Sequence, residues 1–302
     1  METLNNIVLT IQNYMSNIVL IIALAAAGIW FSIRTGFIQV RGFKRGIKQV
    51  FGGLFSKKGD AGDDGMSSFQ ALATAIAAQV GTGNIAGAAT AIALGGPGAI
   101  FWMWVAAFLG MATIYSEALM AQRYKKIGDD GVVTGGPVYY IRAAFKGVFG
   151  KILAGIFAVL LIFALGFMGN AVQSNSIAAS FHTAFGIPQW VMGLIVAVLA
   201  VFIFSGGMKR IAKVTETMVP LMAALYIVGS LIVIFCNWRN IPLAFYEIFV
   251  GAFAPASIAG GAVGATIKLA ITKGVARGLF SNEAGMGSTP HAHAVAKVAH
   301  PA

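Results

Sequence analysis

Long apolar segments separated by short polar or basic segments run along almost the whole chain. The apolar segments lie at about 15–33, 66–94, 99–121, 151–179, 189–206, 214–236 and 242–265. Each is long enough to cross the hydrocarbon core of a bilayer as a helix, which takes about 20 residues. The pattern predicts an all-α integral membrane protein with about seven transmembrane helices.

Composition supports a chain embedded in the lipid bilayer. Hydrophobic residues make up 58% of the sequence and charged residues 10%, against about 25% charged residues in a soluble domain. The mean hydropathy is +0.81. The single cysteine, Cys236, excludes a disulfide within the chain and a cysteine-based metal site.

The positions of the basic residues predict the topology. A net charge of +11 would suit nucleic-acid binding, but the charges cluster at alternate ends of the apolar segments, chiefly in 34–58 and 123–151. All 21 basic residues except Arg239 fall on one predicted side. The positive-inside rule therefore predicts basic loops in the cytoplasm and the N-terminus outside a plasma membrane, in a bacterium the inner membrane. Residues 34–58 read as a basic helix at the interface, and no nucleic-acid partner is expected.

The second apolar segment contains an unusual polar and glycine-rich stretch. Gln79, Gly81, Thr82, Gly83 and Asn84 interrupt a run that is otherwise rich in alanine. Irregular backbone is tolerated at membrane depth only where it lines a cavity or is buried in protein. An unwound segment would expose carbonyl groups to a cation and helix-start N–H groups to a carboxylate, which suits a zwitterionic amino acid with sodium.

One alternative for this stretch stays open. Gly83 and Gly87 have the spacing that allows close packing of an intact helix against a neighbour. Further along, Gly260 and Gly261 interrupt the segment at 242–265 and predict a second broken helix.

Other polar positions are harder to assign. The fourth segment ends in hydroxyl and amide side chains over 170–176, which form either a lining or the wet outer end of the span, with Phe167 and Gly169 deeper. Glu117 is expected at the membrane interface, and Glu216 at the start of a helix. The polar, glycine-rich stretch 278–290 reads as a cytoplasmic loop after a basic amphipathic helix.

The motifs that mark several enzyme classes are absent from the sequence. The chain has no Walker A, HExxH or GxSxG pattern, which argues against an ATPase and an intramembrane hydrolase. We therefore predict that the chain is not an enzyme and uses no cofactor.

Four stretches of the chain resemble a family of transporters, the alanine or glycine:cation (sodium) symporters. They are SSFQAL at 67–72, VGTGNIAG at 80–87, GGPGAIFWMW at 95–104 and GLFSNEAGMGS at 278–288. The resemblance extends along essentially the whole chain. It implies sodium-coupled uptake of a small neutral amino acid, alanine or glycine, with sodium as the coupling ion and the lipid bilayer as surroundings.

The resemblance also implies a fold and a set of site residues. The fold would be LeuT-type, with an N-terminal helix and basic segment in 1–65, a first five-helix repeat in 66–236 and the start of an inverted second repeat in 237–302. The substrate residues implied are Gln79, Thr82, Gly83, Asn84, Phe167, Gly169, Gly260 and Gly261. The ion residues implied are Gln79, Gly81 and Thr82.

The length of the chain departs from the family pattern. Ten core helices are implied, and the chain has room for the first six. We expect a truncated family member in which transport is lost or impaired. The alternative is a non-transporting membrane partner or assembly subunit.

Overall fold

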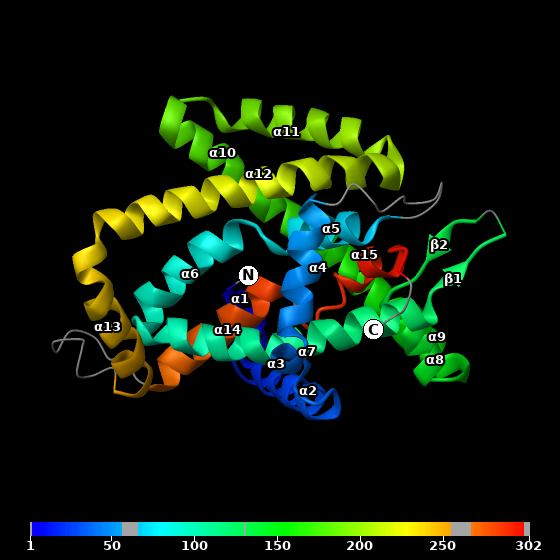
Figure 1. The fold of residues 1–302 in the computed structure, drawn as a ribbon, viewed down its shortest axis with the longest axis horizontal. Coiled ribbons are helices and arrows are strands. Elements are labelled where there is room, and N and C mark those ends of the chain that lie inside the picture. The colour runs from blue at the N-terminus through cyan, green and yellow to red at the C-terminus, as the bar shows by residue number, and fades with distance from the viewer. Residues whose placement is uncertain (1, 56–65, 130, 255–266, 299–302) are drawn as a thin grey trace. The chain divides into compact units, whose positions relative to one another are not determined.

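A computed structural model describes residues 2–55, 66–129, 131–254 and 267–298 (Figure 1). Almost all of them are helical, as the sequence predicts. In the first half of the chain the elements are α1 Glu2–Tyr14, the π-helix Met15–Val19, α2 Leu20–Arg34, α3 Ile38–Arg41, α4 Phe43–Phe55, α5 Ser68–Gln79, α6 Thr82–Gly95, α7 Gly98–Tyr124, β1 Lys126–Ile127 and β2 Val133–Thr134. They continue as α8 Pro137–Ala144, α9 Gly147–Leu161, the π-helix Ile162–Gly169, α10 Asn170–Phe185, α11 Gln189–Phe204, α12 Gly207–Cys236, the 3₁₀ turn Trp238–Asn240, α13 Ile241–Phe253, α14 Ile267–Asn282 and α15 Pro290–Ala294.

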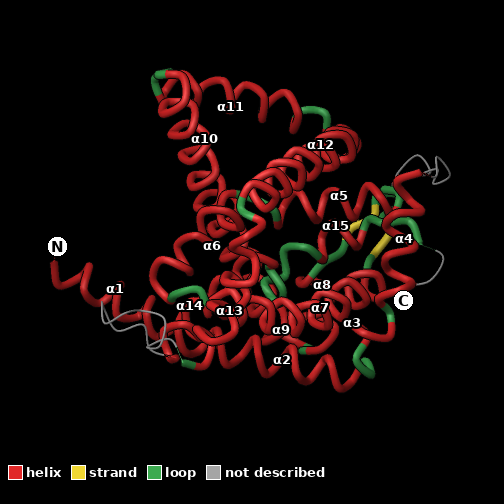
Figure 2. The backbone as a smooth tube through the Cα atoms, turned by 60° about the vertical axis from the view of Figure 1, so that its left-hand side comes forward, coloured by secondary structure: helices red, strands yellow, loops and turns green. Residues whose placement is uncertain are grey.

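Three helices within the described residues are long and apolar enough to cross a membrane. They are α7, the continuous helix Gly147–Phe185 that joins α9 to α10, and α12. The helices α2 and α11 are apolar but shorter. Figure 2 shows how little of the chain is not helical. The helix at 43–55 appears where we predicted a basic interfacial helix.

The chain forms two compact units, which exchange segments along the sequence. The first unit comprises 1–48, 83–116 and 224–286, and the second comprises 49–82, 117–223 and 287–302. Several helices pass from one unit to the other, so each unit is assembled from distant parts of the sequence.

In the first unit, α14 packs along the first half of α7. A Cβ added at Gly274 would lie 2.7 Å from Trp102 Cβ, and one at Gly278 would lie 2.9 Å from Ala106 Cβ. The paired residue numbers rise together, so the two helices run parallel. The missing side chains of both glycines let the helix backbones approach closely. The buried residues Val275 and Leu279 continue this contact, with Ile21 and Leu24 of the N-terminal helix packed against them.

This packing corrects two expectations. The last residues of α13 lie at the start of α7, because Trp102 Nε1 donates a hydrogen bond of 3.2 Å to the carbonyl of Ala252. The first turns of α14 lie at the same end, because Gly95 faces Lys273. The end of α13 and the start of α14 therefore lie at the same end of α7, which differs from a crossing over 242–265; residues 255–266 of that segment lie outside the described residues. The basic helix α14 lies beside the first half of α7 and does not follow its last residue, Tyr124.

In the second unit, a capping box starts α5. Ser67 Oγ accepts the amide hydrogen of Gln70 at 3.1 Å, and Gln70 Oε1 accepts that of Ser67 at 3.0 Å. Such a box satisfies two of the amide groups that a helix start leaves unpaired. Gln70 Nε2 also donates to Glu216 Oε2 at 3.0 Å. Glu216 lies within α12 and binds another helix, so the prediction that it sits at a helix start is wrong.

The last described segment of the chain also packs on α5. Met66 donates its amide hydrogen to Val295 O at 3.1 Å, and Lys297 donates to Met66 O at 2.9 Å. Met66 and Ala296 are buried with Ala71 and Ala212. The strands β1 and β2 pair antiparallel, with Lys126 opposite Thr134 and Ile127 opposite Val133, which we did not predict.

Glu117 differs from its prediction. Its side chain is 6% exposed, whereas we expected an interfacial carboxylate. Burial, and secondarily the negative charge of Glu117, raise the pKa of Tyr140 on α8 above its ordinary value. A carboxylate beside a phenol of this kind keeps the phenol protonated.

Candidate functional site

The helix interruption predicted in the second apolar segment exists and is short. The helix α5 ends at Gln79, Val80 is extended with φ −92° and ψ 106°, and α6 begins at Thr82. We predicted unwinding over Gly81–Asn84, but Gly83 and Asn84 lie in the first turn of α6. The break therefore contains Val80 and Gly81.

In the second unit, Gln173 of α10 holds the start of α6. Its Oε1 accepts a hydrogen bond of 3.2 Å from the amide of Thr82 and one of 3.0 Å from Thr82 Oγ1. The first amide groups of a helix have no acceptor within the helix. Gln173 provides an acceptor for one of them, the amide of Thr82. The bonds explain why the helix restarts immediately after Gly81.

Gly81 leaves the space that Gln173 occupies. A Cβ at position 81 would lie 2.9 Å from Gln173 Cδ and closer still to its Nε2. Gly81 does not have a positive φ, so space and not backbone conformation demands the glycine here. The polar end of the fourth segment thus reaches the break through one amide.

Phe167 and Gly169 do not share this place. The Phe167 ring stacks on Phe163 with 5.6 Å between centroids, and its side chain is 62% exposed. The nearest atom to a Cβ at Gly169 would be Ala164 O, at 3.3 Å. Six residues separate Phe167 from Gln173, which is about one and two-thirds helical turns and places them on different faces.

Gln79 closes the other side of the break within the second unit. Its Nε2 donates a hydrogen bond of 3.0 Å to Thr289 Oγ1, and Thr289 is 2% exposed. Sequence reasoning missed Thr289. The only signal was the polar, glycine-rich composition of 278–290, which we assigned to a cytoplasmic loop.

In the first unit, Asn84 bonds to the end of α14. Asn84 Nδ2 donates to Ser281 O at 3.1 Å. The next residue, Asn282, accepts the amide hydrogen of Ala284 at 3.0 Å through Oδ1. Its Nδ2 is buried with no acceptor among the described residues and faces Gly110. A buried donor without an acceptor costs about 1–3 kcal/mol, so an incoming oxygen atom would be stabilised there.

A second helix interruption follows Asn282. The helix α14 ends there and α15 begins at Pro290. Glu283, Gly285 and Gly287 have φ values of 53°, 86° and 75°, a left-handed conformation that α-helices exclude. The predicted second break at Gly260 and Gly261 lies outside the described residues.

The helices beside the first interruption contact the segments beside the second: α6 lies against α14, and α5 lies against residues 289–297. In the first unit α6 runs antiparallel to α14, since Gly95 faces Lys273 and Asn84 bonds to Ser281. In the second unit the two ends of α5 meet different parts of 289–297, since Gln79 bonds to Thr289 and Met66, just before α5, forms a parallel bridge with Ala296. The small residue Gly87 lies beside the Arg277 side chain, but the alternative of an intact helix does not hold, because α5 ends at Gln79 and α6 begins at Thr82.

The middle and end of the segment 289–297 are bonded to the end of α7. Gln122 Nε2 donates to the carbonyls of His293 and Ala296, the latter at 2.9 Å. Lys125 Nζ donates to Gln122 Oε1 at 2.8 Å. Burial lowers the pKa values of both His293 and Lys125, because a buried cation loses its hydration.

Comparisons with known proteins show the family to which the chain belongs. Residues 1–302 match the model of the sodium:alanine symporter family. A Bacillus subtilis protein named as a sodium/proton-dependent alanine carrier is 48% identical over 92% of the chain and 54% of its own length. The sodium/alanine symporter AgcS of Methanococcus maripaludis is 43% identical over 98% of the chain and 64% of its own length.

A third relative carries a different substrate in its name. A Bacillus subtilis protein named for sodium/glutamine symport is 44% identical over 93% of the chain and 56% of its own length. The chain thus spans little more than half the length of these curated relatives. The match along the whole chain confirms the predicted family and the prediction that the chain is not an enzyme. The chain belongs to the sodium:alanine symporter family, whose members are multi-pass membrane transporters.

Proposed function

We propose that the chain takes part in sodium-coupled symport of a small neutral amino acid, alanine or glycine, into the cell. The observation that carries the proposal is the interrupted helix at Val80–Gly81, whose ends are held by Gln173 and Thr289. Two of the named relatives support alanine as substrate. A third is named for glutamine, which makes the size of the accepted side chain an experimental question.

The two helix ends at the break have opposite partial charges. The first turn of α6, which begins at Thr82, presents amide groups and the positive end of the helix dipole, which favour the carboxylate of an amino acid. The last turn of α5, which ends at Gln79, presents carbonyl oxygens and the negative end, which favour Na⁺. We therefore assign Gln79, Gly81 and Thr82 to the ion, and Gln79, Thr82, Gly83 and Asn84 to the substrate.

The substrate assignment changes at two other places. The exposure of Phe167 and the distance of its helix face from Gln173 remove the support for Phe167 and Gly169. Gly260 and Gly261 lie outside the described residues, and we propose the interruption at 283–288 as a further part of the substrate site. Its buried Asn282 amide is a donor suited to a carboxylate.

These interruptions support a LeuT-type architecture as a proposal. In that architecture a first repeat begins with α5 and α6, and a second begins with α14 and α15. The chain before residue 66 forms the additional N-terminal helix. We further propose an N-terminus outside, with the strands β1 and β2 in the cytoplasm.

Uptake of radiolabelled alanine into vesicles tests the proposal. We expect an inward sodium gradient to drive uptake in vesicles that contain the chain, alone or together with a longer relative that has lost its own activity. Asn84→Ala should abolish this uptake with expression unchanged, because it removes the donor to Ser281 O and a substrate contact. Uptake that ignores sodium, or that survives Asn84→Ala, would contradict the assignment.

A further inference from the structure

Three basic residues of α14 face the N-terminal helix in the first unit. By the N-terminal helix we mean α1, the π-helix Met15–Val19 and α2, which follow one another without a break. Lys273 and Arg277 are half-buried and Lys268 is exposed. Within the described part of the chain, none of the three side chains has a hydrogen bond or an ion pair. Since α14 packs along the first half of a membrane-spanning helix, these charges lie where an unpaired cation is expensive.

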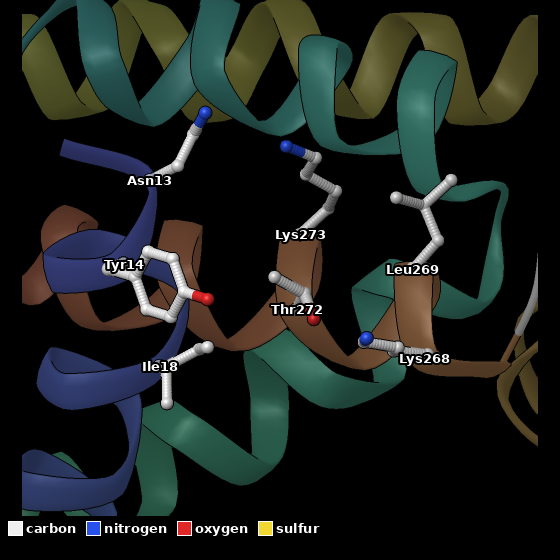
Figure 3. A pocket seen from close by; sticks show the side chains of 7 residues that line it. All are labelled: Asn13, Tyr14, Ile18, Lys268, Leu269, Thr272 and Lys273. Atoms are coloured by element: carbon white, nitrogen blue, oxygen red, sulfur yellow. The ribbon is translucent and has the colours of Figure 1, made fainter. Parts of the chain in front are cut away.

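The three side chains line two adjoining pockets that share Lys273. One pocket, of about 340 Å³, lies between α14 and the N-terminal helix, and Figure 3 shows its lining. Asn13, Tyr14 and Ile18 line it from one side, and the Asn13 amide and the Lys273 ammonium point to the same side of it. The second pocket, of about 280 Å³, is lined by Lys273 and Arg277 together with residues of α6 and the N-terminal helix.

Two glycines of α6 lie against the two half-buried cations and leave room for their side chains. A Cβ at Gly95 would lie 3.1 Å from Lys273 Cβ, and one at Gly87 would lie 3.4 Å from Arg277 Nη1. A Cβ at position 95 would be tight against Lys273, whereas one at position 87 would make an ordinary van der Waals contact with Arg277. The packing of α6 on α14 therefore positions the positive charges at the pockets.

The lining selects the chemistry of the ligand. It contains three cations and several polar groups but no aspartate or glutamate. An amino acid would bring an ammonium group that has no carboxylate to meet it. A phosphate group, with its negative charge and several acceptor oxygens, satisfies lysine and arginine together.

Apolar side chains surround the pockets on the same helices. Ile11 is 58% exposed, Ile18 47% and Leu94 53%. In a membrane such side chains contact acyl chains. Basic pockets between transmembrane helices with this surrounding bind anionic lipid headgroups.

We propose that Lys268, Lys273 and Arg277 bind the phosphate of an anionic phospholipid whose acyl chains lie along the N-terminal helix and α6. The lipid neutralises charges that have no protein partner. It also joins the N-terminal helix to α14, whose last residue, Asn282, precedes the second interruption.

Lipid binding to the purified chain in a neutral detergent tests this proposal, with phosphatidylglycerol as the probe and native mass spectrometry as the readout. Each Lys or Arg near an anionic lipid surface contributes about 1 kcal/mol, so Lys273→Gln and Arg277→Gln should each lower the affinity about fivefold. Lys273→Arg should keep it. Lys126→Gln, at an exposed residue of β1, is the matched control and should change nothing.

Three results would overturn the proposal. Phosphatidylcholine bound as tightly as phosphatidylglycerol would show that no anion is recognised. Equal effects of Lys126→Gln and Lys273→Gln would show that only the net charge matters. Displacement of the lipid by inorganic phosphate at equal concentration would assign the pockets to a soluble anion. Lys268→Gln, at an exposed position, gives the same test if the other variants do not fold, and a loss of about fivefold is again expected.

Discussion

Replacing Gly81 by alanine tests the contact between the break and α10. The new Cβ would lie 2.9 Å from Gln173 Cδ, so the flexible amide end must move away. That movement breaks the two hydrogen bonds to Thr82, each contributing about 0.5–1.5 kcal/mol, or about 1–3 kcal/mol together. Alanine restricts the unfolded chain and returns about 0.4–1 kcal/mol. We expect a net loss of roughly 1–2 kcal/mol.

The sign should reverse once the glutamine is absent. In a Gln173→Ala background the bonds to Thr82 no longer exist and the space beside Gly81 is empty. Because Gly81 does not have a positive φ, Gly81→Ala should then stabilise the protein by about 0.4–1 kcal/mol.

Equilibrium unfolding in mixed micelles measures all four members of this double-mutant cycle. Gly155→Ala on α9 is the matched control, because a Cβ there meets nothing within 4 Å. It should be stabilising in both backgrounds. If Gly81→Ala costs the same with and without Gln173, the two residues are not coupled and the account of the break is wrong.

Two other variants test the pH dependence of stability and the membrane topology. Burial lowers the pKa of His293 from its ordinary 6.5. Below about pH 6.5 the unfolded state therefore binds more protons than the folded state. Stability should fall as the pH drops from there toward the lower pKa of the folded state. His293→Gln should flatten that dependence in unfolding curves recorded between about pH 5 and 8. Lys268→Cys, in a chain whose exposed Cys236 is replaced by serine, should react with a membrane-impermeant maleimide added outside intact cells, because α14 starts beside the first residues of α7. Reaction only with reagent on the cytoplasmic side would contradict this expectation and support the cytoplasmic position that the charge pattern predicts.

The helical membrane architecture was predictable because hydrophobicity records it directly. The apolar segments around 99–121 and 214–236 correspond to α7 and α12. The segment 242–265 was less predictable, because apolarity alone does not distinguish a crossing helix from one that stays at one end of a neighbour, as α13 does beside the start of α7. Charge alone placed Lys268 and Lys273 in a cytoplasmic loop, whereas the structure places both on α14, where they line a pocket against Asn13, Tyr14 and Ile18.

The candidate site was half predictable. Glycines and polar residues within an apolar helix marked Gly81 and Thr82, because a membrane tolerates such a break only for a reason. The partner residues Thr289 and Ser281 were not predictable, since more than 190 positions separate them from Gln79 and Asn84. Only tertiary packing brings them there. The sequence did not single out Gln173 within 170–176, because position along a helix does not determine which face a residue shares with its neighbours.

Sodium-dependent alanine binding to the purified chain tests the central claim most directly. Radiolabelled alanine would be titrated in sodium and in choline buffers, with Thr82→Val and, as the matched control on the same helix, Thr90→Val, whose hydroxyl bonds only to Ala86 O. We predict binding in sodium alone, lost in Thr82→Val and kept in Thr90→Val. Equal binding in choline, or a Thr82→Val variant that binds like the wild type, would contradict the claim that the break at Val80–Gly81 is the sodium and amino-acid site.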